Sequence, residues 1–194
     1  MNYDKSKLSH QFLFALVEMR DVEDLLFKAT AAVSERTDVP QAKQTFRIWS
    51  EESRKHAQTL QKMIEKVKGN VLTENCLKCI EDGMTVSYAA YQIQKYENEV
   101  EVRESLGMVA ARDLAEKHIT IESEVEGRYA QIAEMTDEEE IKKELIRLSD
   151  EEKNHHVLAQ KLIDLIDRAI EEDAKARELV KQTEGLKKPF HDRS

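Results

Sequence analysis

Two side chains that commonly bind metals, Glu152 and His155, stand three residues apart in the stretch SDEEKNHHVLAQKLI, residues 149–163. Residues at this spacing lie on one face of a helix. The surrounding apolar spacing predicts that this face is buried, in the series Ile141, Leu145, Leu148, Glu152, His155, Ala159, Leu162 and Ile166. Carboxylate and imidazole together are a ligand mixture that suits iron, manganese or zinc.

An internal repeat places similar chemistry in the chain a second time. A shift of 99 residues aligns 22–67 with 121–166 without a gap. Glu23 then falls on Glu122, and SEESRKH (50–56) falls on SDEEKNH (149–155). Each repeat reads as a helical hairpin.

The same alternation of three and four residues, applied to all four helices, puts polar groups at one level of their apolar faces. These residues are Glu23, Ser53, His56, His118, Glu122, Glu152 and His155. An unpaired buried carboxylate costs several kcal/mol, and the four faces contain no Lys or Arg. Something cationic is therefore expected among these side chains, with protonation as one solution and a metal ion as another. Glu52 and Glu151 point about 100° away from the inward positions and are predicted to be surface residues.

The elements that must position these groups are four helices. We expect them at 9–34, 39–68, 108–134 and 137–181, with a stop at Gly69-Asn70 and an N-cap at Asp137. The prediction is an all-α, ferritin-like four-helix bundle, built from two repeated hairpins with a long helical crossover. It forms one domain, 1–181, with repeat one at 9–69, the crossover at 70–105 and repeat two at 106–181, followed by a flexible tail at 182–194.

Composition agrees with a helical, cytoplasmic protein. The 194 residues include only 5 Gly and 2 Pro. The net charge of -9, with basic residues mixed among acidic ones, argues against a nucleic-acid partner. No apolar run approaches a membrane span, and the N-terminus lacks the apolar region of a signal peptide. Cys76 and Cys79 are interpreted as ordinary helix-face cysteines, with a redox pair or an intermolecular metal site as alternatives.

A lone Glu on one helix of each hairpin, followed by Glu-x-x-His on its partner helix, resembles the carboxylate-bridged di-iron proteins of the ferritin-like superfamily, and rubrerythrins in particular. The resemblance covers roughly 9–170. It implies two iron ions, with manganese or zinc as alternatives, held by Glu23, His56, His118, Glu122, Glu152 and His155. Tyr129, seven residues after Glu122, is interpreted as a core aromatic with its hydroxyl on a carboxylate, with a radical site as the alternative.

Several departures from the rubrerythrin pattern stand out. Ser53 occupies the position of the second bridging glutamate, which leaves three core carboxylates against the four positive charges of two divalent ions. Val125 replaces an additional glutamate that many relatives carry. His118, whose repeat equivalent is Met19, is either a compensating nitrogen ligand or a hydrogen-bond donor to a ligand. No cysteine follows Cys79, so a C-terminal rubredoxin domain is not expected and electrons would come from a separate donor protein.

The resemblance implies an oxidoreductase that reacts with peroxide or dioxygen, or that oxidises ferrous iron. One alternative is a degenerate relative that binds a single metal ion or none and serves as a structural or interaction module. Another is a mononuclear manganese or zinc site at Glu122, Glu152 and His155 with His118. By analogy with the family a homodimer is expected, with the linker helix at 85–104 as its contact surface.

Overall fold

Four long helices form the described part of this computed structural model, which comprises residues 5–71, 93, 95, 98 and 106–186. The helices are α1 (Lys5–Arg36), α2 (Pro40–Val71), α5 (Met108–Ala133) and α6 (Glu139–Leu186). In these residues the only β-type pairing is an isolated bridge between Thr37 and Leu106. The predicted all-α, ferritin-like four-helix bundle is confirmed.

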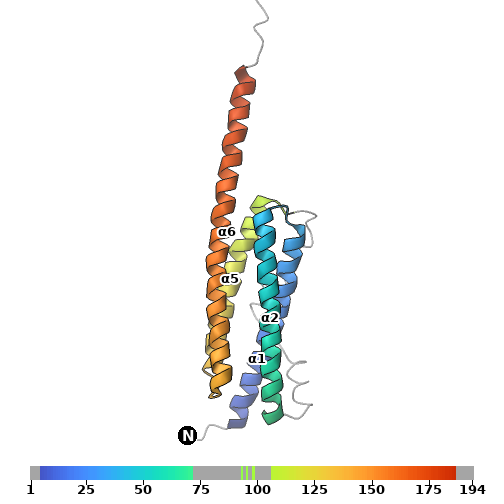
Figure 1. Cartoon of the computed structure of the whole chain (residues 1–194), viewed down its shortest axis with the longest axis vertical. Helices are drawn as coiled ribbons and strands as arrows, with labels where there is room; N and C mark the ends of the chain where they lie inside the picture. The colour runs from blue at the N-terminus through green and yellow to red at the C-terminus, as the bar shows by residue number, and fades with distance from the viewer. Residues whose placement is uncertain (1–4, 72–92, 94, 96–97, 99–105, 187–194) are drawn as a thin grey trace, which may run out of the picture.

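The helices pack as two hairpins placed side by side (Figure 1). α1 packs mainly on α2, and α5 packs mainly on α6. The hairpins meet where α2 lies beside α6 and where α1 lies beside α5. Because α2 and α5 run in the same direction, a crossover must join opposite ends of the bundle (Figure 1). Of the crossover helix predicted at 85–104, Ile93, Lys95 and Asn98 are described and helical, and Ile93 is fully buried. The rest of that helix, Cys76, Cys79 and most of the predicted tail lie outside the described residues.

Several predicted helix ends are wrong by a few residues. α2 continues through Gly69 and Asn70 to Val71, and α6 continues to Leu186. The N-cap of α6 is Glu138 rather than Asp137, because the carbonyl of Glu138 accepts the first helical hydrogen bond, from Lys142. The hydroxyl of Thr136 accepts a bond from the Glu138 N–H, which displaces the cap by one residue.

The two hairpins repeat the same close contact between their helices. In the first hairpin the Ser50 hydroxyl donates to the Phe27 carbonyl oxygen at 3.1 Å. In the second, the Ser149 hydroxyl donates to the Glu126 carbonyl oxygen at 3.2 Å. Both partners in the second bond lie 99 residues after those in the first. The internal repeat is therefore a repeat of three-dimensional packing as well as of sequence.

The core lies between the four helices and follows the predicted inward faces. Phe46, Trp49, Leu145, Leu148 and Ile132 are fully buried. Burial of side chains of this size supplies most of the free energy that holds such a bundle together. Among the helices that the structure describes, none combines the length and apolar character needed to cross a bilayer.

The C-terminal part of α6 extends past the other three helices (Figure 1). Ile166 is still buried and Ile170 packs against the core at its edge. Beyond that point most side chains are exposed, including Leu179 at 63% and Val180 at 54%.

We expect Thr37→Val to lower the free energy of unfolding by about 1–2 kcal/mol. The Thr37 side chain is buried, donates to the Leu106 carbonyl oxygen at 3.1 Å and accepts from the Val39 N–H at 3.3 Å. The substitution removes both bonds where the start of α5 meets the α1–α2 turn. Thr136→Val is the matched control, since Thr136 is the repeat equivalent and accepts its bond at the surface. Urea unfolding of both variants should show the larger loss for Thr37→Val; equal losses would contradict the expectation.

Candidate metal centre

Six buried metal-binding side chains come from all four helices and meet at one level of the bundle. They are Glu23 from α1, His56 from α2, His118 and Glu122 from α5, and Glu152 and His155 from α6, and each is at most 3% exposed. No Lys or Arg of the described chain is buried with them. The three carboxylates are therefore not neutralised by basic side chains of the Lys or Arg type.

Glu152 lies at the centre of the cluster. Its Oε1 atom is 2.8 Å from His56 Nδ1, and its Oε2 atom is 2.9 Å from His155 Nδ1. The two imidazoles belong to different hairpins, and their rings are stacked with centroids 6.1 Å apart. One carboxylate thus faces the inner nitrogen of both histidines with a different oxygen.

Glu152 is shared between two groups that could each hold one metal ion. The Glu23 triad consists of Glu23, His56 and Glu152, and the Glu122 triad consists of Glu122, Glu152 and His155. Within each triad, one ligand atom per residue lies within 4.8 Å of the others. In the Glu23 triad the second carboxylate contact, Glu23 Oε1 to His56 Nδ1, is 3.3 Å. In the Glu122 triad the corresponding contact, Glu122 Oε2 to His155 Nδ1, is 3.5 Å.

The polar atoms that face the interior fit a metal better than they fit one another. His56 Nδ1, His155 Nδ1, Glu152 Oε1 and both carboxylate oxygens of Glu122 make no hydrogen bond, despite the short distances between them. Buried polar atoms are normally hydrogen-bonded, because leaving one unpaired costs about 1–3 kcal/mol. A metal ion requires several ligand lone pairs close to one another. These atoms meet that requirement, because they lie close together without the geometry of hydrogen bonds.

Without metal, protons balance the charge of the cluster. Burial lowers the pKa of His56, but its close contacts with Glu152 and Glu23 outweigh burial and raise it to about 11. Burial likewise opposes protonation of His155, and Glu122, Glu152 and Glu52 raise its pKa well above the usual value. Burial and the neighbouring Glu122 carboxylate raise the pKa of Glu152. Metal binding must therefore displace protons from this cluster.

Glu122 differs from Glu152 in its electrostatic surroundings. Burial raises the pKa of Glu122, but the neighbouring His118, together with contacts to Glu152 and His155, lowers it well below its usual value. The Glu122 carboxylate is therefore the group that keeps its negative charge when the two acids compete for a proton. A negatively charged carboxylate is therefore available at this position to a group that could hold a metal ion.

Each inner histidine is held from outside by a glutamate of the opposite hairpin. His155 Nε2 donates to Glu52 Oε2 at 2.6 Å, and His56 Nε2 donates to Glu151 Oε2 at 3.1 Å. The bond to His155 lowers the pKa of Glu52 against the opposing effect of burial. A proton fixed on Nε2 leaves the Nδ1 lone pair directed inward, as ligation requires.

Glu52 and Glu151 lie at the surface, as predicted, but their contacts with His155 and His56 were not expected. Their side chains are 38% and 40% exposed, and the carboxylates reach the neighbouring helix at the bundle edge. The repeat could have revealed them, since Glu52 and Glu151 are 99 residues apart and stand four residues before His56 and His155. Arg147 contacts Glu151 from the solvent side.

The remaining predicted site residues lie in or beside the cluster. Tyr129 is fully buried and donates its hydroxyl to Glu23 Oε1 at 2.5 Å. Burial and the negative charge of Glu23 raise its pKa well above the usual value, so the hydroxyl keeps its proton. Ser53 is 1% exposed and Val125 is buried, so neither supplies a carboxylate. His118 Nε2 lies 2.8 Å from Glu122 Oε1.

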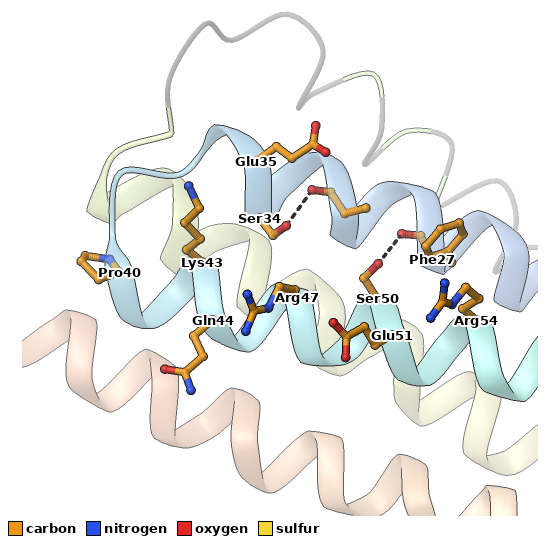
Figure 2. A pocket seen from close by; sticks show the side chains of 11 residues that line it. Phe27, Ser34, Glu35, Pro40, Lys43, Gln44, Arg47, Ser50, Glu51 and Arg54 are labelled. Atoms are coloured by element: carbon orange, nitrogen blue, oxygen red, sulfur yellow. Dashed lines mark hydrogen bonds between the residues drawn. The ribbon is translucent and has the colours of Figure 1, made fainter.

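A separate groove lies between α1 and α2 and does not reach the cluster (Figure 2). Its volume is about 720 Å³, and its rim carries Lys43, Arg47 and Arg54 with Glu51. The Ser34 and Ser50 hydroxyls in its wall are bonded to α1 carbonyl oxygens (Figure 2). The groove contains no imidazole, and we assign it no chemistry.

We expect Glu52→Gln and Glu151→Gln each to weaken metal binding about 10-fold, since partners of this kind contribute 10–100-fold to affinity. Each variant removes the negative charge that holds a proton on the outer nitrogen of one histidine. Glu51→Gln, an exposed neighbour of Glu52, is the matched control. Isothermal titration with Mn²⁺ measures all three. Wild-type affinity in both Glu52→Gln and Glu151→Gln would contradict a role for these residues.

The comparisons with known proteins give one match. A family model described as Rubrerythrin matches residues 23–163, a span that contains both triads and both outer glutamates. Neither the curated proteins nor the solved structures yielded a match. The matched span covers most of the chain.

Proposed function

The chain belongs to the rubrerythrin family, and on that premise we propose that it is a non-haem dinuclear iron protein that reduces hydrogen peroxide, with dioxygen as the alternative oxidant. The observation that carries the proposal is the position of Glu152, whose two oxygens face the inner nitrogens of His56 and His155. A carboxylate in this position can bridge two ions.

Reduction of hydrogen peroxide takes two electrons and two protons, breaks the O–O bond and yields two water molecules. Two ferrous ions, when bound, supply one electron each. A separate donor protein returns the two electrons after each turnover.

The protein's own residues prepare the site for this reaction. Tyr129 fixes the orientation of Glu23 through a buried hydrogen bond. Glu52 and Glu151 hold the outer nitrogens of His155 and His56. The core layers above and below the cluster exclude bulk water, which strengthens the electrostatic interactions among these groups.

A second candidate function, a degenerate relative with one metal ion or none, is favoured by Ser53. This residue is buried at the level of the cluster, and its neutral hydroxyl cannot bridge two metals. Glu23, Glu122 and Glu152 carry three negative charges against four positive charges on two divalent ions. A bound hydroxide or small carboxylate would restore neutrality in the dinuclear form.

The proposal is tested by loading metal-free protein with ferrous iron without oxygen and then mixing it with hydrogen peroxide in a stopped-flow instrument. We expect two iron ions per chain, both oxidised in one fast phase as one peroxide is consumed. Glu172→Gln, an exposed change on α6, should behave like the wild type. Fewer than about one iron per chain, or oxidation no faster than that of free iron, would support the degenerate reading instead.

Ser53→Glu separates a weakened dinuclear site from a single-metal site. We expect the added carboxylate to raise iron content toward two ions per chain and affinity by about 10-fold, since a direct ligand contributes at least as much as an outer partner. Ser53→Gln has the same size without the charge and should leave iron content unchanged. Iron content measured after desalting decides between these outcomes, and no gain in Ser53→Glu would contradict the dinuclear interpretation.

A further inference from the structure

In their metal-binding side chains and outer glutamates, the two halves of the cluster match at three repeat positions and differ at two. Glu23 matches Glu122, His56 matches His155, and Glu52 matches Glu151. The first difference is Ser53 against Glu152, and because Glu152 serves both triads it does not favour either one. The second is Met19 against His118, which stands four residues before Glu122 on the same helix face. His118 is therefore the metal-binding side chain that distinguishes the surroundings of the Glu122 triad.

His118 is buried without a satisfied hydrogen bond. The side chain is 1% exposed, and neither Nδ1 nor Nε2 makes a hydrogen bond. Its Nε2 atom approaches Glu122 Oε1 to 2.8 Å, yet not in the direction of an N–H···O bond. A buried imidazole with both nitrogens unpaired is costly unless another atom binds one of them.

Trp49 holds the His118 ring in this orientation. The two rings are stacked with centroids 4.1 Å apart and planes inclined by 27°. Phe46 packs edge-on against Trp49, with ring centroids 4.9 Å apart, and so restrains the Trp49 ring. A face-to-face stack offers no hydrogen-bond partner to the imidazole nitrogens. It does fix the ring with Nε2 beside Glu122 Oε1. His118 stands outside the set of ligand atoms that lie within 4.8 Å of one another, so ligation requires the Glu122 carboxylate to turn toward it.

We propose that His118 is a fourth ligand of the metal position at the Glu122 triad, so that this position fills before the one at the Glu23 triad and the half-loaded protein is a populated state. The inference rests on the proposed function and adds an order of binding to it. The Glu122 position then offers two imidazoles and two carboxylates, whereas the Glu23 position offers one imidazole and two carboxylates. Four ligands with two nitrogens suit Co²⁺ and Zn²⁺ better than three ligands with one.

Stepwise titration of the metal-free protein with Co²⁺ tests the order of binding, followed by calorimetry and by visible absorption, which reports the ligands of cobalt. For the wild type we expect two steps with affinities at least 10-fold apart. His118→Phe keeps an aromatic ring against Trp49 and removes the nitrogens. It should lower the affinity of the first step about 10-fold, bring the two steps together and change the first-step spectrum.

Two further variants control the cobalt titration. His156→Phe removes a histidine of α6 that lies outside the cluster and should leave both steps unchanged. His118→Gln repeats the loss of the nitrogens with a different side chain, and circular dichroism checks that both His118 variants keep their helices. Wild-type binding in either folded His118 variant would overturn the proposal.

A crystal grown with one equivalent of Co²⁺ gives an independent reading from anomalous scattering at the cobalt edge. We expect the stronger peak beside His118 and Glu122. A stronger peak at the Glu23 triad, or equal peaks, would overturn the order of filling while leaving the dinuclear site intact. Absence of cobalt at both triads would count against the proposed function itself.

Discussion

Glu152→Gln is expected to abolish binding of both metal ions, with a loss of at least 100-fold in affinity at each position. Glu152 belongs to both triads and faces two imidazoles with separate oxygens, so one substitution removes a ligand from each metal. A neutral amide cannot replace a bridging carboxylate. Metal content after anaerobic loading and desalting is the measurement, and Glu172→Gln on the exposed part of α6 is the control. Metal retained at either triad in Glu152→Gln would contradict the shared-ligand arrangement.

The same substitution should barely change the stability of the metal-free protein. Burial and the nearby Glu122 carboxylate raise the pKa of Glu152, so its carboxyl is held neutral when no metal is bound. Glutamine then replaces a neutral group of similar size, and we expect a change of less than about 1 kcal/mol in the free energy of unfolding. Urea unfolding in the presence of a chelator measures it. This contrast separates loss of a ligand from loss of the fold.

Metal loading should raise the melting temperature by about 10–20 °C. Each ion held at a concentration 100 times its dissociation constant stabilises the folded state by about 2.7 kcal/mol, and a chain of this size gains about 2–4 °C per kcal/mol. Calorimetry with Mn²⁺ against chelator measures the shift without iron oxidation. Glu152→Gln provides the negative control and should melt at the same temperature in both conditions. A wild-type protein insensitive to metal would contradict a role for the cluster as a metal site.

The sequence was sufficient to predict the fold and the level of the cluster because both depend on periodicity. Alternating steps of three and four residues placed Glu23, His118 and Glu152 on inward faces, and all three are buried. The 99-residue repeat then required two similar hairpins, which the equivalent bonds of Ser50 and Ser149 display. Apolar periodicity predicts the fold well because the helices pack through the faces that this periodicity defines.

The contacts between hairpins could not be predicted in the same way. Glu52 and Glu151 lie off the inward faces, and their bonds to His155 and His56 depend on how closely α2 approaches α6. The sharing of Glu152 depends on side-chain torsions, which helical spacing does not determine. The end of α6 was also missed, because the helix continues to Leu186, past the last residue that the sequence pattern assigned to it.

The length of α6 places its C-terminal end far from the buried cluster. At a rise of about 1.5 Å per residue, its last residue, Leu186, stands roughly 45 Å along the axis from His155. A partner that bound the C-terminal end of α6 would therefore lie far from the buried cluster. In the proposed function an electron donor would approach the flank of the bundle, so a partner bound at the end of α6 would not compete with it for the same surface.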